Sequence, residues 1–168
     1  YFFNALDTVI CMGASDSMRQ GFVLSRPDMA NQVISITGDS TECHSGLDST
    51  RNAVFRNVPG VKVILDNRIT AMTGGQVAPS SPINLSNNQH NFNLRKAVEA
   101  EGCRTVVLDG YNIKQIENEL KISLELTKEG IFSVLIIEGE CIHEVPKEKT
   151  IPKLQFDYDI CVNCGLCN

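Results

Sequence analysis

Two short polar stretches carry residues that could bind a divalent metal ion. They are Gly38-Asp39-Ser40 and Asp66-Asn67, and each directly follows an apolar run, QVISIT at 32–37 and VKVIL at 61–65. Magnesium prefers about six oxygen ligands, usually one or two carboxylates together with phosphate oxygens and water. An Asp carboxylate, an Asn amide oxygen and one backbone carbonyl would supply half of that set, which leaves room for a diphosphate.

The same stretches also have an ordinary structural interpretation. Gly-Asp is a common turn and Asp-Asn a common end to a strand, so neither is informative alone. Asp66 is more often a turn residue than a ligand, since Asn67 takes the ligand position. Both stretches follow consecutive predicted strands, and a right-handed strand–helix–strand unit would bring them together at one sheet edge. This combination favours a metal–diphosphate site, at which Gly38 lets the backbone turn sharply beside the ligand.

Three cysteines form a second candidate site at the end of the chain. Cys161, Cys164 and Cys167 have the C-x2-C-x2-C spacing of ferredoxin-type iron–sulfur modules. A zinc site is the alternative, although zinc seldom uses three cysteines at this spacing. We interpret the other four as lone buried thiols in a reducing, cytoplasmic compartment. They are Cys11, Cys43, Cys103 and Cys141.

Composition narrows the class of protein. The chain has 168 residues, enough for one domain with a hydrophobic core, and a net charge of −5 without a Lys/Arg cluster. This argues against a nucleic-acid partner. No apolar run is long enough to span a membrane, and residues 1–7 do not resemble a signal peptide. The chain opens without Met and ends in the cysteine cluster, so we expect further sequence on both sides.

The periodicity of apolar residues alternates between strand and helix. Alternation of this kind predicts an α/β fold with a doubly wound, mostly parallel sheet and helices on both faces. Ligands of such folds lie beyond the carboxyl ends of the strands, where the two polar stretches lie. The predicted strands are 8–12, 32–37, 61–65, 105–108 and 132–137. The predicted helices are 17–24, 45–56, 94–100 and 112–129.

Two segments have no sustained period. Residues 68–91 are rich in Gly, Pro, Ser, Asn and Thr, and a loop of that length is usually functional or disordered. The chain becomes polar and proline-interrupted after Glu144. We therefore predict a cofactor-binding domain at 1–145, a linker at 146–160 and the truncated start of an iron–sulfur module at 161–168.

Three motifs in order give the chain a family resemblance. GDSTECHSG at 38–46, DNRITAMTGGQVAP at 66–79 and CMGAS at 11–15 resemble the thiamine-diphosphate-binding domain of the 2-oxoacid:ferredoxin oxidoreductases. The resemblance covers almost the whole chain and is strongest to a C-terminal part of the alpha subunit in the indolepyruvate branch. The chain departs from the family pattern at Glu42-Cys43, where an apolar or aromatic pair is expected. Ser15 to Met18 is also more polar than usual.

The resemblance implies roles for individual residues. Asp39, Asn67 and the backbone carbonyl of Ile69 would bind Mg2+. The cysteines of the C-terminal cluster would bind a 4Fe-4S cluster in the full-length protein. The implied contacts to thiamine diphosphate are Cys11, Met12, Gly13, Gly38, Asp39, Ser40, Asn67, Ile69, Thr70, Ala71, Met72, Thr73 and Gly74, with 70–75 closing over the cofactor.

The histidines are less informative. His44 is either an acid or base near the cofactor or substrate, or a histidine at a helix start that hydrogen-bonds to backbone. We rank His90 and His143 as surface residues.

The resemblance further implies an activity. It is the oxidative decarboxylation of aryl pyruvates to acyl-coenzyme A with reduction of ferredoxin. The partners would be the rest of the subunit, a beta subunit, ferredoxin, coenzyme A and a 2-oxo acid. The alternatives are a related thiamine enzyme that acts on pyruvate or 2-oxoglutarate-type substrates, and a non-catalytic phosphate-binding α/β domain. The glutamate that activates the cofactor would come from another domain, so we expect no turnover from this chain alone.

Overall fold

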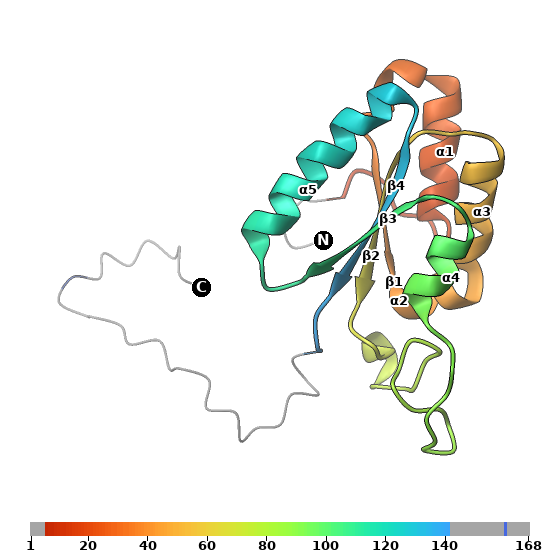
Figure 1. Cartoon of the computed structure of the whole chain (residues 1–168), viewed down its shortest axis with the longest axis vertical. Coiled ribbons are helices and arrows are strands. Elements are labelled where there is room, and N and C mark those ends of the chain that lie inside the picture. The colour runs from red at the N-terminus through yellow and green to blue at the C-terminus, as the bar shows by residue number, and fades with distance from the viewer. Residues whose placement is uncertain (1–5, 142–159, 161–168) are drawn as a thin grey trace.

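A four-stranded parallel sheet forms the centre of the molecule (Figure 1). The computed structural model describes residues 6–141 and Ile160. The strand order is β1-β2-β4-β3, and all neighbours are parallel. The strands are β1 (Ile34–Gly38), β2 (Gly60–Asp66), β3 (Arg104–Asp109) and β4 (Phe132–Glu138). Four of the five predicted strands are therefore confirmed.

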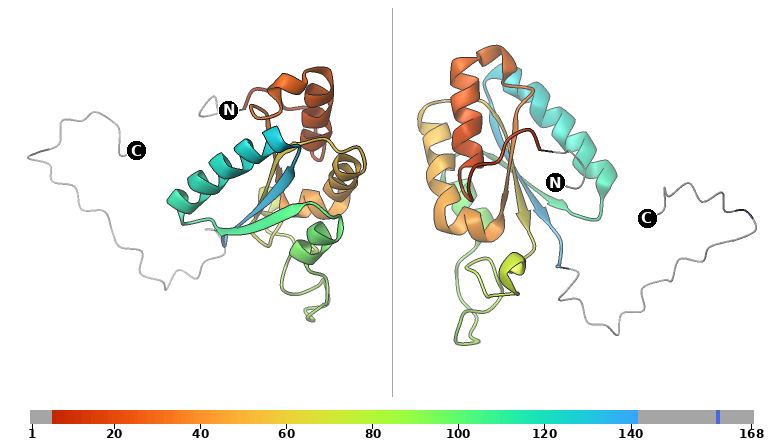
Figure 2. Two further views of the ribbon diagram at one scale, coloured as in Figure 1. Left: turned by 45° about the horizontal axis from the view of Figure 1, so that its top comes forward. Right: turned by 180° about the vertical axis from the view of Figure 1, so that it is seen from behind.

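Helices cover both faces of the sheet, as the sequence predicts. Figure 2 shows α5 on one face and α1, α3 and α4 on the other. The helices are α1 (Ser15–Ser25), α2 (Asp39–Thr41), α3 (Leu47–Phe55), α4 (Leu94–Ala100) and α5 (Ile113–Leu126). A π-helical segment, Glu42–Gly46, joins α2 to α3, and 3-10 turns lie at Pro27–Met29, Ala71–Thr73 and Thr127–Glu129.

Alternate side chains of β2 build two separate apolar layers. Ile64 packs with Ala53 of α3 and Val98 of α4, whereas Val61 and its neighbours pack against α5. Successive residues of a strand point to opposite faces, so a strand between two layers of helix is apolar at nearly every position. This explains why the runs 61–65 and 132–137 carry little alternation.

Two predicted elements are wrong in detail. The segment 8–12 is not a strand, and Val9 and Ile10 are 56% and 72% exposed. The helix expected from Ser45 begins at Asp39, because the backbone turns helical directly after the extended residue Gly38. The linker at 146–160 and the module at 161–168 lie almost wholly outside the described residues, and both stay predictions. None of the helices among the described residues is long and apolar enough to cross a bilayer.

The loop from residue 68 to residue 93 extends beyond the carboxyl ends of the strands (Figure 1). The structure gives it a defined conformation with two isolated antiparallel bridges, Thr70↔Gln76 and Ile83↔Gln89. Ser81 ties the loop to its own start, because its Oγ donates to the carbonyl of Arg68 at 2.6 Å. A loop held in this way can present residues to a ligand.

Candidate functional site

The two polar stretches meet at the carboxyl ends of β1 and β2. These strands are parallel neighbours, and Gly38 pairs with Leu65. Asp39 therefore lies one residue beyond a paired position on one strand, and Asn67 lies two residues beyond it on the other. The side chains of Ser40 and Thr70 join the two connections, since their hydroxyl oxygens are 2.8 Å apart. Neighbouring strand ends thus bring Asp39 and Asn67 to one place, as the spacing predicts.

Two carboxylates are buried together at this place. Asp39 is 3% exposed and Asp66 is 8% exposed. Burial, followed by the negative charge of Asp39, raises the pKa of Asp66 to about 6. Within the described residues neither carboxylate forms an ion pair with Lys or Arg. Two adjacent buried carboxylates without a cationic partner are a suitable environment for a divalent cation.

Ser80 orients one of these carboxylates from the long loop. Its Oγ donates to Asp39 Oδ2 at 2.5 Å. Sequence reasoning missed this residue, because nothing in the Ser-Pro-rich loop marks one serine above another. It also gave Asp66 too little weight. Asp66 lies two residues after the buried Ile64 and therefore points to the same face of β2, and this spacing was the available signal.

The Asn67 turn is closed by short contacts of its own. Asn67 Oδ1 accepts a hydrogen bond from the Ile69 N–H at 3.2 Å, and Asp66 Oδ1 accepts one from the Arg68 N–H at 3.1 Å. Arg68 has a φ of 61°, in the left-handed region. Asn67 and Ile69 are both half-buried. The turn therefore keeps the proposed amide and carbonyl ligands close to the strand end.

Gly13, in the motif at 11–15, packs against the helical segment that follows β1. Gly13 has a φ of 89°, and a Cβ there would lie 3.2 Å from Ser45 Cβ and would collide with its hydroxyl. Glycine is therefore required both for the conformation and for the close approach. Cys11 and Met12 beside it are exposed. The expectation that Cys11 is a buried thiol is thus wrong.

The segment from Thr70 to Gly75 is a closed turn next to the same strand ends. The Gly75 N–H donates to the carbonyl of Thr70 at 3.0 Å, and Gly74 adopts a φ of 113°. Met72 is 89% exposed. Ala71 is half-buried and Thr73 is exposed. Thr70 contacts Ser40, so the motif at 66–79 adjoins the motif at 38–46, as the proposed cofactor contacts require.

The titratable side chains around this edge differ from the expectations in two respects. His44 is exposed, and its ring makes no hydrogen bond to any described residue, so neither of its two interpretations gains support. His90 is half-buried rather than superficial. Its Nε2 lies 2.7 Å from the Ser81 carbonyl, and its Nδ1 accepts from the Phe92 N–H at 3.3 Å. His143 lies outside the described residues.

Cys43 is a poor nucleophile in this setting. Burial, with a further contribution from the charge of Asp39, raises the pKa of Cys43 to about 12. The thiolate is the reactive form of cysteine, and almost none is present at neutral pH. Cys103 and Cys141 are half-buried, in fair agreement with the sequence interpretation.

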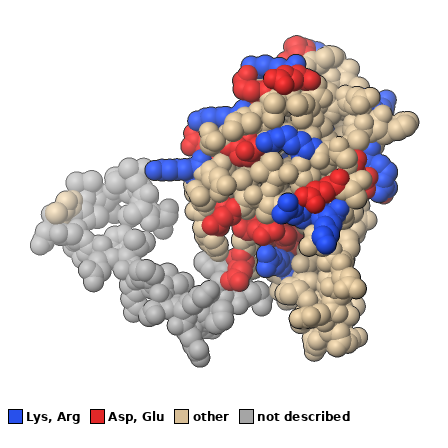
Figure 3. All heavy atoms as spheres, viewed as in Figure 1, with Lys and Arg blue, Asp and Glu red and all other residues tan. Residues whose placement is uncertain are grey.

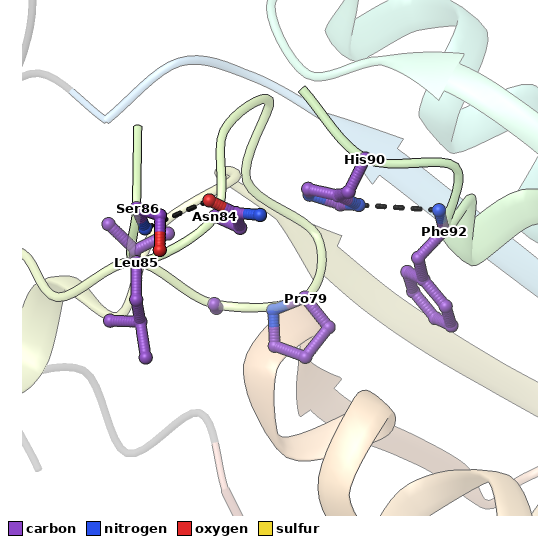
Figure 4. Close-up of a pocket in the computed structure, with 8 residues that line it drawn as sticks. Pro79, Asn84, Leu85, Ser86, His90 and Phe92 are labelled. Atoms are coloured by element: carbon purple, nitrogen blue, oxygen red, sulfur yellow. Dashed lines mark hydrogen bonds between the residues drawn. The ribbon is translucent and has the colours of Figure 1, made fainter. Parts of the chain in front are cut away.

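An uncharged hollow of about 430 Å3 lies within the long loop (Figure 4). Its polar groups are largely engaged inside the loop. Asn84 Oδ1 accepts from the Ser86 N–H at 2.9 Å, and both ring nitrogens of His90 form hydrogen bonds with backbone atoms of the loop. The segment 69–94 contains no Asp, Glu, Lys or Arg, and Figure 3 shows a tip without charged atoms. The lining residues are Val77, Ala78, Pro79, Asn84, Leu85, Ser86, His90 and Phe92.

Comparison with known proteins identifies the family of the chain. Residues 2–137 match the family model described as thiamine pyrophosphate enzyme, C-terminal TPP binding domain. The chain is 34% identical over 125 residues to indolepyruvate oxidoreductase subunit IorA of Methanothermobacter thermautotrophicus, covering 73% of this chain and 20% of that protein. It is 30% identical over 181 residues to the subunit of the same name from Pyrococcus abyssi, covering 98% and 28%. The chain thus spans between a fifth and three tenths of these relatives.

Solved structures share the fold at low sequence identity. The 2-oxoglutarate:ferredoxin oxidoreductase from Magnetococcus marinus aligns with a TM-score of 0.54 and 19% identity, over 77% of this chain and 46% of that chain. The thiamine diphosphate-dependent 4-hydroxybenzoylformate decarboxylase of Rhodococcus jostii RHA1 aligns with a TM-score of 0.53 and 16% identity, over 77% and 23%.

Proposed function

The chain belongs to the thiamine pyrophosphate enzymes, whose C-terminal TPP-binding domain it matches, and on that premise we propose that it holds the cofactor's diphosphate through Mg2+. Asp39, Asn67 and the carbonyl of Ile69 would be the protein ligands. The observation that carries this proposal is the pair of buried carboxylates, Asp39 and Asp66, at the ends of two adjacent parallel strands. Burial, followed by the charge of Asp39, raises the pKa of Asp66, and a cation bound there would offset both effects.

The residues around this pair have the chemistry that the cofactor needs. Ser40 and Thr70 carry hydroxyl groups at the junction of the two connections, within reach of a diphosphate bound there. Ser80 holds the Asp39 carboxylate in one orientation. Gly13 and Gly38 would border the cofactor, as would the exposed turn 70–75. Bound thiamine diphosphate supplies the electron sink for decarboxylation of 2-oxo acids, and the protein supplies binding and orientation.

We propose further that the full-length protein is an indolepyruvate ferredoxin oxidoreductase. It would oxidatively decarboxylate aryl pyruvates to acyl-coenzyme A and reduce ferredoxin, together with a beta subunit in the cytoplasm. Cys161, Cys164 and Cys167 would bind a 4Fe-4S cluster there, although they lie outside the described residues. Support for this substrate class comes from the names of the relatives. This chain alone would lack the cofactor-activating glutamate and would be inactive.

The lining of the hollow in the long loop favours a substrate with an apolar side chain. It adjoins the proposed metal site, because Pro79 lines it and the next residue, Ser80, contacts Asp39. A second carboxylate, such as that of 2-oxoglutarate, would find no cationic side chain in its lining. An indole ring would instead meet Leu85 and Phe92, which are 89% and 41% exposed. We therefore favour aryl pyruvates over 2-oxo diacids.

Calorimetric titration tests the cofactor proposal. We expect the chain to bind thiamine diphosphate in the presence of Mg2+ and to lose that binding by about 100-fold or more in EDTA or after Asp39→Ala. Asp109→Ala is a matched control, since Asp109 is an exposed carboxylate at the end of β3, which β4 separates from β2 in the sheet. Binding that is equally strong without Mg2+, or unaffected by Asp39→Ala, would contradict the proposal.

A further inference from the structure

A fully buried ion pair joins the helical segment that carries Asp39 to the strand that leads to Asn67. Glu42 Oε2 lies 2.6 Å from Lys62 Nζ, and the two side chains are 0% and 1% exposed. Lys62 Nζ also donates to Thr50 Oγ1 at 2.7 Å, and Thr50 Oγ1 donates to Glu42 Oε1 at 2.9 Å. The charges of Glu42 and Lys62 are thus shielded from solvent, and each also has a hydrogen bond with Thr50.

Stability alone does not explain this pair. Desolvation of two charges offsets much of their attraction, so a well-packed apolar pair of similar volume is often as stable or more so. Lys62 also interrupts an otherwise apolar strand, between Val61 and Val63. A buried ion pair differs from an apolar contact in one respect that matters here, because it fixes direction and distance between two specific atoms.

The ion pair is also part of an unusual helical turn. Glu42–Gly46 is π-helical, a conformation that accounts for well under 1% of residues and often occurs at functional sites. Lys62 Nζ binds the carbonyl of Gly46 at 3.1 Å. A Cβ at position 46 would lie 2.7 Å from Glu42 Cδ and would collide with the carboxylate. Gly46, Glu42 and Lys62 therefore form one unit that holds the π turn in place.

Along the chain, this unit falls between the two proposed metal ligands. Glu42 follows Asp39 by three residues on a continuous helical segment, and Lys62 precedes Asn67 by five residues on β2 and the turn after it. We propose that the Glu42–Lys62 ion pair is a positioning clamp. It sets the separation of Asp39 from Asn67 to suit Mg2+, and this role rests on the proposed function above.

The clamp predicts a change in metal preference when its charges are removed. Mg2+ demands near-ideal octahedral geometry at about 2.0–2.1 Å, whereas Ca2+ accepts longer and more variable distances. In Glu42→Leu/Lys62→Met the apolar volume is kept but the fixed distance is lost. We expect the ratio of thiamine diphosphate affinities in Mg2+ and in Ca2+ to fall by about 10-fold. A general loss of stability would lower both affinities alike.

The measurement uses the 168-residue chain with calorimetric titration in each metal and thermal unfolding of every variant. Arg104→Met/Glu119→Leu is the matched control, since that 2.7 Å ion pair joins β3 to α5 away from the site. Glu42→Gln is a second variant, which keeps the side-chain volume and an acceptor for Thr50. The spectrum of bound Mn2+ in electron paramagnetic resonance reports the geometry of the metal site directly.

The outcomes separate the clamp from the function on which it rests. We expect a reduced Mg2+/Ca2+ ratio and a changed Mn2+ spectrum in both Glu42 variants, with the control pair unchanged within about twofold. A folded Glu42→Leu/Lys62→Met, or a folded Glu42→Gln, with wild-type ratio and spectrum would overturn the clamp alone. A wild-type chain that binds thiamine diphosphate without any metal dependence would overturn the proposed function and the clamp with it.

Discussion

Replacing Asp66 by Asn is expected to stabilise the ligand-free chain at about pH 8. Burial beside Asp39 raises the pKa of Asp66 from 3.8 to about 6. At about 1.4 kcal/mol for each pH unit, this difference corresponds to roughly 3 kcal/mol. Solvent screening at the open strand end reduces the expected gain to about 1.5 kcal/mol. The melting temperature of Asp66→Asn should then exceed that of the wild type by about 5 °C.

The size of this effect depends on pH in a defined way. Below about pH 3 the carboxyl is largely protonated in the folded and the unfolded chain, so Asp66 and its Asn replacement are equivalent. As the pH rises from about 3 to about 6, the unfolded chain ionises first, and the folded wild type loses stability relative to Asp66→Asn. Above about pH 7 both states are ionised and the difference is constant.

Thermal unfolding in EDTA at about pH 4, 5 and 8 measures this difference. Asp109→Asn is the control, since Asp109 ends β3 in the equivalent register but is exposed. Mg2+ with thiamine diphosphate should reverse the order, because the cation interacts favourably with the wild-type carboxylate. An Asp66→Asn variant that gains no stability at pH 8, or gains the same at pH 4, would refute the argument from paired carboxylates.

Three further predictions follow from the site and the loop. Cys43 should react with iodoacetamide at about pH 8 at least 100-fold more slowly than the exposed Cys11, because burial and nearby carboxylates raise the pKa of Cys43 to about 12. Mass spectrometry of peptides gives both rates, and equal rates would contradict this. Phe92→Ser should weaken indole binding by about 10-fold, measured by indole fluorescence because the chain has no Trp, whereas Phe55→Ser, at an 83% exposed position on α3, should leave it unchanged. The chain loaded with thiamine diphosphate and Mg2+ should show no turnover of indolepyruvate with an artificial electron acceptor, and clear activity would disprove the need for a glutamate from another domain.

Most of the sheet could be predicted from the sequence because its strands are buried on both faces. The runs 61–65 and 132–137 are apolar at almost every position, which is the pattern of a strand between two helical layers. The segment 8–12 has the same composition but no described strand pairs with it. Composition alone records the tendency of a segment to form a strand, and pairing depends on a neighbour.

The position of the proposed metal ligands was also predictable, whereas their surroundings were not. Asp39 and Asn67 follow consecutive strands, and the topology of parallel sheets brings such ends together. Ser80 reaches Asp39 from a loop without periodicity, so its contact depends on the tertiary path of the loop. The ion pair between Glu42 and Lys62 was hidden for a similar reason, since each residue taken alone resembles a surface charge.

We propose that Asp39, Asn67 and the carbonyl of Ile69 bind one magnesium ion that carries the cofactor's diphosphate. A crystal structure of the chain with Mg2+ and thiamine diphosphate tests it most directly. We expect a six-coordinate ion about 2.0–2.1 Å from oxygens of these three residues, with two further ligands from the diphosphate. A diphosphate bound away from the ends of β1 and β2, or an ion without Asp39 among its ligands, would contradict it.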